Sequence, residues 1–480
     1  MTARDRFLAE FPKAIIDDAA AIFVGAGVST GAGYPTWRKL LHDIGRELGV
    51  DAGDVSDLAA LAQWSVRKSA GRTRVNNVIH AEIAPEKPIP ETLKTLARLP
   101  IRNIWTTNYD RLIERAFGEI NRPIDALSST ANLAIKPRPG AARLFKMHGS
   151  IENVNDVVIA TDDYELYRLN RGAFLPLLQS HMTSFSMLFM GLSFTDPNVR
   201  HVLSLIRESF TSSPPEHFAI VKPPQRNEYG SKKEFSARLI QHKLWSDDLL
   251  RYGLNVVEID DYGEVAELMQ EIERRVASNR VWISGSWPLV GGPDENLTYV
   301  AEVARAVGQR LAERDFTLVT GAGLVVGAAS LSGFLSALQR SGSWDLERRL
   351  IARPFPQPLR GEEPNLTQWE GLRAEMARIA GAVIFIGGAK WDGQQLVEAT
   401  GVRAELEAAR TAGAFVLPVG STGGTAKAIA EEMINAPGTT LRKSTPRPSK
   451  TDLRMLMKAG EPNAVAEAVL SVLLKQEHGR

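Results

Sequence analysis

The chain has 480 residues, of which 44% are hydrophobic and 24% are charged, and this length predicts two or three domains rather than a single core. The 57 Lys and Arg residues against 56 Asp and Glu residues leave a formal net charge of +1, so the overall charge gives no reason to expect nucleic acid or an anionic membrane as a partner. The absence of cysteine excludes disulfides, thiolate zinc sites and a cysteine nucleophile, and it is compatible with a reducing cytoplasm.

The N-terminal segment does not have the pattern of a secretory signal. Its apolar stretches are interrupted by Asp5, Glu10, Asp17 and Asp18, whereas a signal peptide has an uninterrupted apolar core. No segment approaches the roughly 20 apolar residues that a membrane-spanning helix requires. We therefore expect a cytoplasmic protein with no membrane partner.

In the first half of the chain, short apolar runs alternate with helical patterns. The runs are AIFVG (21–25), NIWTTN (103–108), LFKMHG (144–149), MLFMG (187–191), HFAIV (217–221) and NVVEID (255–260), and helical patterns such as 90–99 and 110–117 lie between them. Buried strands that alternate with helices favour a parallel sheet covered on both faces. Ligands of such sheets bind beyond the carboxyl ends of the strands.

The same pattern restarts in the second half. An amphipathic helix over 264–279 precedes the runs VWISGS (281–286), TLVTG (317–321), VIFIGG (383–388) and FVLPVG (415–420). The sequence therefore predicts an α/β protein with two Rossmann-like, doubly wound parallel-sheet domains. We expect these domains to cover residues 1–279 and 280–480.

A Gly-rich turn, GAGVSTGAGYPTW (25–37), directly follows the first apolar run. Gly25 and Gly27 permit a tight turn and allow backbone N–H groups, including that of Ala26, to approach a pyrophosphate. Ser29 and Thr30 add hydroxyl groups at the expected start of a helix. The turn predicts a nucleotide site, and the alternative is a tight connection between strand and helix.

Two further segments end strands of the same predicted sheet. TTNYD (106–110) brings Asn108, and KMHGS (146–150) brings His148. Both side chains are expected at the edge of the sheet where the Gly-rich turn lies. Asp110 and Asp196 are weaker candidates for this site, because either residue can simply cap the helix that follows it.

These segments resemble the signatures of the sirtuin family, in the family's order, over roughly residues 10–275. GLSFTDPNV (191–199) resembles the adenosine-side segment of the bacterial sirtuin-like branch, which adds Gly191 and Ser193 to the expected NAD-binding residues. The chain departs from sirtuin deacetylases, because it cannot build their four-cysteine zinc module and has Pro35-Thr36-Trp37-Arg38 in place of Pro-Asp-Phe-Arg. The resemblance implies NAD as substrate and no metal.

Cleavage of NAD leaves an oxocarbenium-like ribose, and the departing nicotinamide is already cationic. Cleavage of such a bond requires orientation of the reactants and stabilisation of charge more than it requires a strong acid. Asn108 can hold the ribose or the attacking water, and His148, with an ordinary pKa of about 6.5, can accept a proton near neutral pH. We expect hydrolysis to ADP-ribose and nicotinamide.

The second half carries glycine turns at 285–286, 320–327, 386–390 and 419–424, which together predict a nucleotide pocket with Gly285, Ser286 and Gly388. This half resembles the SLOG family. Hydrolases related to that family have a Pro-Gly-Gly-x-Gly-Thr turn, whereas this chain has Gly-Gly-Thr-Ala-Lys at 423–427, so sensing is favoured over catalysis.

A sirtuin-like domain followed by a SLOG domain resembles the ThsA family, the effectors of bacterial Thoeris antiphage systems. The resemblance implies a homo-oligomer, a tetramer or larger, activated by a cyclic ADP-ribose isomer that a TIR-domain partner produces. It also implies that Arg373, Lys390 and Glu405 bind this activator through phosphate and ribose groups. For each of the three residues the alternative is an ordinary surface charge.

Two other functions remain open from the sequence. A zinc-free protein deacylase would turn over NAD only with an acylated lysine peptide. A non-enzymatic scaffold would bind NAD or ADP-ribose and release no nicotinamide.

Overall fold

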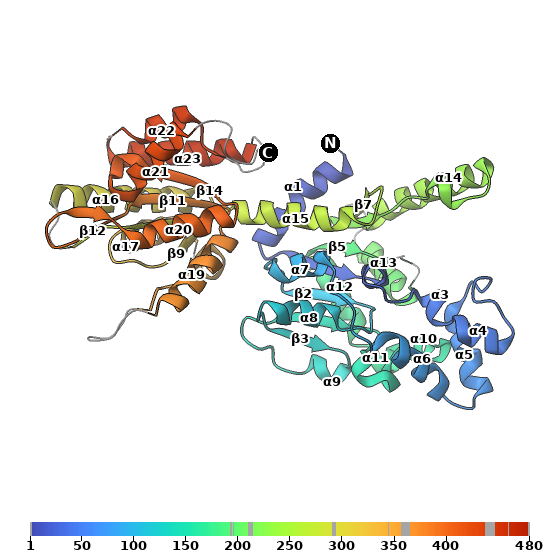
Figure 1. The fold of residues 1–480 in the computed structure, drawn as a ribbon. Helices are drawn as coiled ribbons and strands as arrows, with labels where there is room; N and C mark the ends of the chain where they lie inside the picture. The colour runs from blue at the N-terminus through green and yellow to red at the C-terminus, as the bar shows by residue number, and fades with distance from the viewer. Residues whose placement is uncertain are drawn as a thin grey trace. The chain divides into compact units, whose positions relative to one another are not determined.

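The structure is a computed structural model that describes residues 2–192, 194, 196–209, 215–289, 294–343, 345–356, 365–436, 447–458 and 460–478. The chain divides into two compact units, Met1–Glu273 and Arg274–Arg480 (Figure 1). Each unit has its own parallel sheet, which confirms the predicted α/β class with two Rossmann-like domains. Among the described residues, no helix combines the length and the apolar character needed to cross a membrane.

The first unit is built on a seven-stranded sheet of order β3-β4-β2-β1-β5-β6-β7, in which all neighbouring strands are parallel. The strands are β1 (Ala20–Val24), β2 (Asn103–Thr106), β3 (Ile124–Leu127), β4 (Ala142–Lys146), β5 (Ser186–Met190), β6 (His217–Val221) and β7 (Leu254–Glu258). Six of them fall on predicted runs. The strand β3 was not predicted, because its sequence, IDAL, is short and only Leu127 in it is buried.

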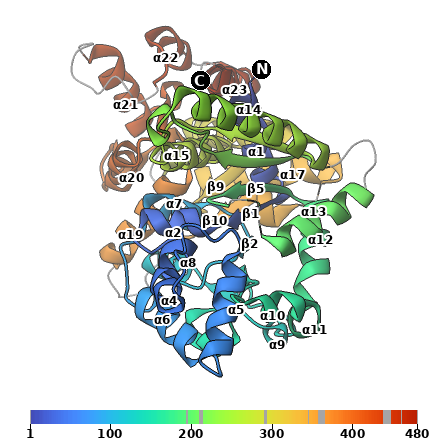
Figure 2. The same cartoon turned by 90° about the vertical axis from the view of Figure 1, so that its right-hand side faces the viewer.

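Helices cover this sheet and extend one end of the unit. They are α1 (Ala3–Ile16), α2 (Ala26–Gly31), α3 (Trp37–Leu40), α4 (His42–Leu48), α5 (Leu58–Lys68), α6 (Thr73–Ile83), α7 (Glu91–Arg98), α8 (Leu112–Glu119), α9 (Thr130–Leu133), η1 (Ile151–Asp156), α10 (Thr161–Glu165), α11 (Tyr167–Arg171), α12 (Phe174–Ser184), α13 (Pro197–Ser209), η2 (Arg226–Glu228), α14 (Lys232–Leu249), η3 (Leu250–Tyr252) and α15 (Glu264–Ser278). Figures 1 and 2 show α4, α5, α6 and α10 grouped together beside the sheet.

A row of aromatic side chains sets the register of the central strands. Trp105 of β2 stacks on Phe145 of β4 with ring centroids 4.5 Å apart, and Phe23 of β1 stacks on Phe189 of β5 at 5.6 Å. These four residues are register partners across β4, β2, β1 and β5. A slip by one residue would expose this row, and each aromatic pair adds about 0.5–1.5 kcal/mol. The row therefore fixes which residues reach the carboxyl edge of the sheet.

The second unit has a five-stranded parallel sheet of order β10-β9-β8-β11-β14 and a small antiparallel hairpin, β12–β13. The strands are β8 (Arg280–Ser286), β9 (Thr317–Thr320), β10 (Leu350–Ala352), β11 (Ala382–Gly387), β12 (Ala389–Trp391), β13 (Leu396–Glu398) and β14 (Phe415–Val419). The helices are α16 (Asp294–Glu313), α17 (Val326–Ser341), α18 (Leu346–Arg349), α19 (Leu366–Ile379), α20 (Thr400–Thr411), η4 (Gly420–Thr422), α21 (Gly424–Asn435), α22 (Lys450–Leu456) and α23 (Pro462–His478). The order of the five strands matches the dinucleotide-binding arrangement.

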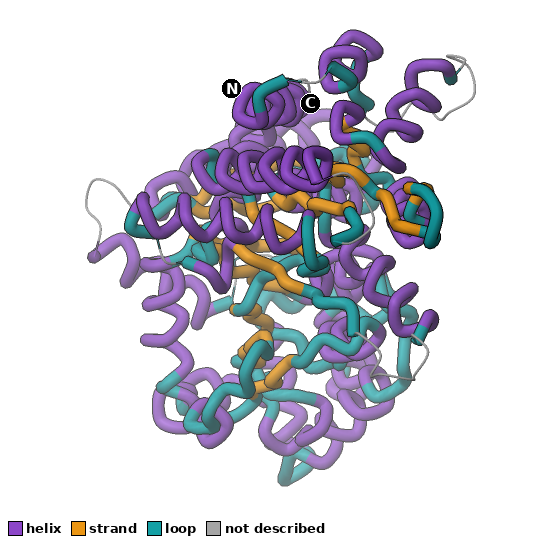
Figure 3. The backbone as a smooth tube through the Cα atoms, turned by 90° about the vertical axis from the view of Figure 1, so that its left-hand side faces the viewer, coloured by secondary structure: helices purple, strands orange, loops and turns teal. Residues whose placement is uncertain are grey.

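Alternate residues of β8 point into two separate cores of the second unit. Val281 and Ile283 lie in the core formed with α16, α17 and α23, whereas Trp282 lies in the core formed with α19, α20 and α21. Figure 3 shows helices on either side of the strands. Both faces of the sheet are thus buried, which explains why these strands read as continuous apolar runs in the sequence.

Candidate active site and second nucleotide site

The turn after β1 packs against the turn after β5. A Cβ atom on Gly25 would lie 2.3 Å from the carbonyl oxygen of Gly191, and one on Gly27 would lie 2.8 Å from the Cα of Gly191. Gly191 itself has φ +69°, a conformation that favours glycine. These three glycines are therefore required by the contact between two neighbouring turns. Ala26 and Gly27 remain exposed at the start of α2.

The two hydroxyl groups of this turn are already engaged within the protein. Ser29 is buried and donates to Oδ2 of Asp110 at 2.7 Å, and Thr30 donates to the carbonyl oxygen of Ala26 at 3.0 Å. Asp110 also accepts from the backbone N–H of Leu112 at the start of α8. Asp110 thus joins the Gly-rich turn to the loop after β2 and to the first residue of α8. The predicted residue Ser193 lies outside the described residues.

Asn108 is held in one orientation at the end of β2. Its Nδ2 donates to Ser29 Oγ at 2.9 Å and to the carbonyl oxygen of Gly25 at 3.1 Å. Its Oδ1 is buried and has no hydrogen-bond partner. A buried carboxamide oxygen left unpaired is costly unless something fills the place beside it. The structure therefore presents an oriented acceptor next to the Gly-rich turn.

His148 follows β4, the strand next to β2. Thr106 and Lys146 are register partners, so Asn108 and His148 each lie two residues beyond a paired position on adjacent strands. The His148 side chain is only 5% exposed, and its Nε2 lies 3.3 Å from Oδ2 of Asp196, although the geometry is not that of a hydrogen bond. Because Asp196 follows β5, this contact extends across the carboxyl ends of the intervening β2 and β1.

The surroundings of His148 shift its pKa in opposite directions. Burial lowers the pKa below its ordinary value and dominates, the carboxylate of Asp196 raises it, and the guanidinium of Arg171 lowers it. The ring of Tyr164 meets that of His148 edge-on at 5.6 Å, and the Tyr164 hydroxyl donates to Asp196 at 3.4 Å. Burial thus favours the unprotonated imidazole of His148, whereas the carboxylate beside it favours protonation.

We expect Asp196→Asn to move the pH dependence of turnover at this site. Without the carboxylate, which raises the pKa of His148, that pKa falls further below its ordinary value. A base must be unprotonated to act, so activity is lost as pH falls through this pKa, and the acid limb moves to lower pH. The asparagine retains the Oδ1 that accepts from the N–H groups of Asn198 and Val199, so the cap of α13 is kept. A pH–rate profile measures the shift, and an unmoved acid limb would show that Asp196 does not act on His148.

Lys146, which the sequence pattern does not single out, connects the two candidate catalytic segments. Its side chain is 1% exposed, and its Nζ donates to the carbonyl oxygen of Asp110 at 2.5 Å and to Glu114 Oε1 at 2.8 Å. A buried lysine is rare unless it is paired. The only signal in the sequence was a charged residue at the end of an apolar strand. Lys146 fixes the loop that carries Asn108 to the strand that leads to His148.

We expect Lys146→Met to lower the free energy of unfolding by about 3–5 kcal/mol, because it leaves the buried carboxylate of Glu114 without its partner. Urea unfolding of the variant and of Lys136→Met, which changes an exposed lysine, measures the difference. The double variant Lys146→Met/Glu114→Gln should recover part of the loss. Equal stability of the two single variants would contradict this assignment.

In the second unit, the glycine turns at the carboxyl edge of the sheet pack against one another. A Cβ atom on Gly285 would lie 1.9 Å from the carbonyl oxygen of Ile386, and one on Gly388 would lie 2.7 Å from the Cβ of Thr425. Gly388 donates to the carbonyl oxygen of Ser286 at 2.8 Å. The turns after β8, β11 and η4 therefore form one continuous edge.

Arg373 and Glu405 lie together near this edge, and both side chains are almost buried, at 11% and 12% exposure. Arg373 Nε lies 3.9 Å from Glu405 Oε1, and Ser284 Oγ donates to Glu405 Oε2 at 2.5 Å. The guanidinium of Arg373 lies over the rings of Phe355 and Trp369, at 5.4 and 5.7 Å from their centroids. Its Nε has no hydrogen-bond partner. The site thus holds a hydrogen-bond donor beside a pair of aromatic rings.

The pKa of Glu405, the acceptor in this site, is unusual for a glutamate. Burial raises the pKa of Glu405 to about 7, while the hydrogen bond from Ser284 and the charge of Arg373 oppose the shift. Arg403 does not pair with Glu405; it pairs with Glu398 and Glu432. Lys390 is exposed on the β12–β13 hairpin, and among the described residues it forms no ion pair with Arg373 or Glu405.

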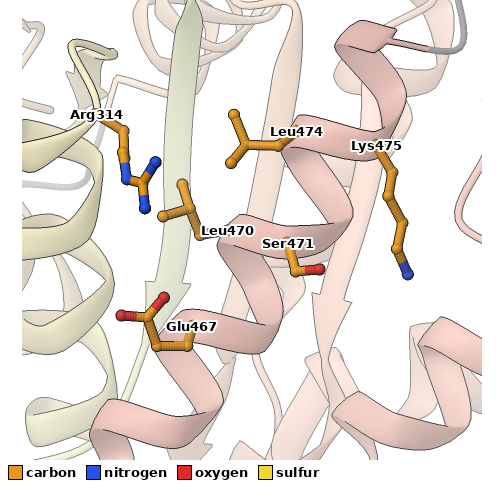
Figure 4. A pocket seen from close by; sticks show the side chains of 6 residues that line it. All are labelled: Arg314, Glu467, Leu470, Ser471, Leu474 and Lys475. Carbon is orange, nitrogen blue, oxygen red and sulfur yellow. The ribbon is translucent and has the colours of Figure 1, made fainter.

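A groove of about 420 Å³ lies elsewhere in the second unit. It is lined by Arg314, Glu467, Leu470, Ser471, Leu474 and Lys475, mostly from α23 (Figure 4), and it contains none of the predicted site residues. Within the described ranges, no group of three or more His, Asp or Glu residues is placed to hold a metal ion.

The two units define a class of protein, a sirtuin-like domain followed by a SLOG domain. Residues 102–244 match the SIR2-like domain family, and residues 264–476 match the Sir2- and TIR-associating SLOG family. The chain is similar to proteins named NAD(+) hydrolase ThsA. It is 35% identical to that of Bacillus cereus, over 88% of this chain and 87% of the relative. It is 32% identical to that of Cytobacillus dafuensis, over 90% and 89%, and 31% identical to that of Enterococcus faecium, over 88% and 89%.

This similarity extends over nearly the whole of both chains and includes both units. The chain belongs to the ThsA family.

Proposed function

We propose that this protein is an NAD⁺ glycohydrolase, and that residues 1–279 hydrolyse NAD⁺ whereas residues 280–480 sense an activating nucleotide. The observation that carries the proposal is the oriented carboxamide of Asn108, whose buried Oδ1 has no hydrogen-bond partner. It lies just beyond β2, and the buried imidazole of His148 lies just beyond the adjacent strand β4. The curated relatives are named for the same activity.

The reaction uses these two side chains in different ways. Asn108 Oδ1 accepts a hydrogen bond from the attacking water or a ribose hydroxyl and so orients it. Water attacks the anomeric carbon of the ribose, the bond from that carbon to the nicotinamide nitrogen breaks, and its electron pair neutralises the departing ring. His148 accepts the proton that the water loses. The products are ADP-ribose and nicotinamide, with one proton released.

The NAD⁺ diphosphate is assigned to the exposed backbone of the Gly-rich turn. Ala26, Gly27 and Thr30 are exposed there. Because the N–H of Gly27 already donates to the carbonyl oxygen of Gly191 at 2.9 Å, the N–H of Ala26, the first residue of α2, is assigned to a diphosphate oxygen. Gly25, Gly191, Ser29 and Asp110 hold the turn in place through the contacts described above. Asp196 acts on His148.

The second part of the proposal is regulation. A cyclic ADP-ribose isomer from a TIR-domain partner binds beside Gly285, Ser286 and Gly388, with its phosphates on Arg373 and Lys390 and a ribose hydroxyl on Glu405. Such a ligand activates only if it binds the active arrangement better than the resting one. NAD depletion by a homo-oligomer in the cytoplasm would then serve Thoeris antiphage defence.

Hydrolysis is tested by the products formed without a peptide. Incubation of the protein with NAD⁺ alone should release nicotinamide and free ADP-ribose in equal amounts, as read by chromatography and mass spectrometry. Turnover that requires an acylated lysine peptide would instead indicate a deacylase. Bound NAD⁺ with no nicotinamide release under any activator would indicate a scaffold.

A further inference from the structure

Two tyrosine rings from consecutive helices contact the imidazole of His148. Tyr164 of α10 meets the His148 ring edge-on with ring centroids 5.6 Å apart, and Tyr167, the first residue of α11, meets it edge-on at 6.3 Å. The Tyr167 hydroxyl donates to the carbonyl oxygen of Met147 at 3.0 Å, so it is bound to the backbone beside His148. The two tyrosines therefore share one ring contact but have different hydrogen-bond partners.

The Tyr164 hydroxyl has a carboxylate as its partner. It donates to Oδ2 of Asp196 at 3.4 Å, and the same oxygen lies 3.3 Å from Nε2 of His148. Burial raises the pKa of Tyr164 well above its ordinary value, so the hydroxyl keeps its proton and remains a donor. One carboxylate oxygen thus faces both a neutral hydroxyl and the imidazole.

The other oxygen of Asp196 is bound to the backbone. Its Oδ1 accepts from the N–H groups of Asn198 and Val199 at 2.9 and 3.1 Å, which ties the carboxylate to the first turn of α13. Nε2 of His148 is buried and has no hydrogen-bond partner. Among the described residues, Tyr164 is therefore the side chain that donates to Oδ2.

The other charged groups that act on His148 have partners of their own. Arg171 of α11 lowers the pKa of His148 and Asp163 of α10 raises it, and both effects are smaller than those of burial and of the carboxylate after β5. Arg171 pairs with Asp156 at 2.7 Å, and Asp163 pairs with Arg72. The carboxylate that the tyrosine hydroxyl binds is thus the charge with the largest effect on the imidazole.

We propose that Tyr164 is a positioning residue for NAD⁺ hydrolysis: its ring orients the imidazole of His148, and its hydroxyl limits how strongly Asp196 stabilises the protonated imidazole. The inference rests on the proposed function, in which His148 is the base. A hydroxyl that donates to a carboxylate stabilises the charge of that carboxylate and reduces its attraction for a second partner. Tyr164 therefore keeps His148 available to accept a proton, whereas Asp196 alone would hold the protonated form more firmly.

Tyr164→Phe removes the hydroxyl and keeps the ring. The pKa of His148 should rise, because Asp196 then faces the imidazole without a competing donor, and the acid limb of the pH–rate profile should move to higher pH. This direction is opposite to the one expected for Asp196→Asn. The kcat on the high-pH plateau should stay within about tenfold of the parent, because loss of a base costs about 10²–10⁴. Tyr164→Phe/Asp196→Asn should have the acid limb of Asp196→Asn alone, because the hydroxyl acts through the carboxylate.

Two further variants separate the hydroxyl from the ring and from a structural effect. Tyr167→Phe removes a buried hydroxyl that binds the backbone, so it should leave the acid limb in place even where it lowers the melting temperature. Tyr164→Leu also removes the ring and should lower the plateau kcat by about 10²-fold, because the imidazole loses a contact that orients it. Equal acid limbs in Tyr164→Phe, Tyr167→Phe and the parent would overturn the proposal.

A titration of His148 tests the same inference without catalysis. In the full chain labelled with ¹³C-histidine, which has 8 histidines, the His148 signal is the one lost in His148→Gln. Its NMR titration midpoint should lie at higher pH in Tyr164→Phe than in the parent. A parent protein that releases no nicotinamide would refute the proposed function and leave this titration readable. An unmoved midpoint would refute the role of Tyr164, whatever the activity of the protein.

Discussion

Replacement of Asn108 by alanine should lower the kcat of nicotinamide release by about 10³-fold, with NAD⁺ affinity changed by less than about tenfold. The loss is large because the unpaired Oδ1 is the group assigned to orient the attacking water or the ribose, and removal of one oriented polar group in an active site typically costs about 10²–10³ in kcat. Single-turnover kinetics and NAD⁺ binding by calorimetry separate the two quantities.

The matched control is Asn170→Ala, which removes an exposed carboxamide from α11 in the same unit and should retain the activity of the parent protein. Because Asn108 also donates to Ser29 and Gly25, Asn108→Asp is a useful second variant. It retains an oxygen at the Oδ1 position but loses the donor. Parental kcat in Asn108→Ala would show that the carboxamide only braces the Gly-rich turn.

Replacement of Arg373 by glutamate should raise the concentration of a cyclic ADP-ribose isomer that activation requires by about 100-fold or more. The guanidinium is nearly buried beside the rings of Phe355 and Trp369, and its Nε has no hydrogen-bond partner. A reversed charge there removes a charge-assisted contact to phosphate and adds repulsion, and loss of a buried charged partner typically costs about 2–5 kcal/mol.

Arg378→Glu makes the same charge change on the exposed face of α19 and should leave activation unchanged. Arg373→Lys keeps the charge but loses the planar, stacked guanidinium. The activator concentration that it requires should lie between those of Arg373→Glu and Arg378→Glu. The activator concentration at half-maximal nicotinamide release measures all three. Equal response of Arg373→Glu and Arg378→Glu would place the activator elsewhere.

The strands that position the NAD site could be predicted from the sequence because burial on both faces makes them continuous apolar runs. Phe23, Trp105, Phe145 and Phe189 belong to such runs, and their alignment across the sheet brings the following polar residues to one edge. The strands that were missed are marginal: β3 is half-exposed, β10 is a three-residue edge strand, and β12 and β13 form a short hairpin.

Partners far apart in the sequence could not be predicted. Nothing in the segment around Asp196 indicates that it crosses the sheet edge to His148, and nothing in KMHGS indicates that Lys146 holds the carbonyl oxygen of Asp110. Likewise, the pairing of Ser29 with Asp110 depends on two loops meeting in space. A periodic pattern identifies an element and its buried face, but side-chain contacts between elements depend on strand order and loop path.

The first unit should cleave NAD⁺ without a peptide, and a nucleotide on the second unit should control this activity. The most direct measurement is nicotinamide release by the purified full chain given NAD⁺ alone, with and without cyclic ADP-ribose isomers. We predict release with no peptide present and a marked increase with one isomer. No release under any of these conditions, from a protein that is folded and binds NAD⁺, would contradict the account.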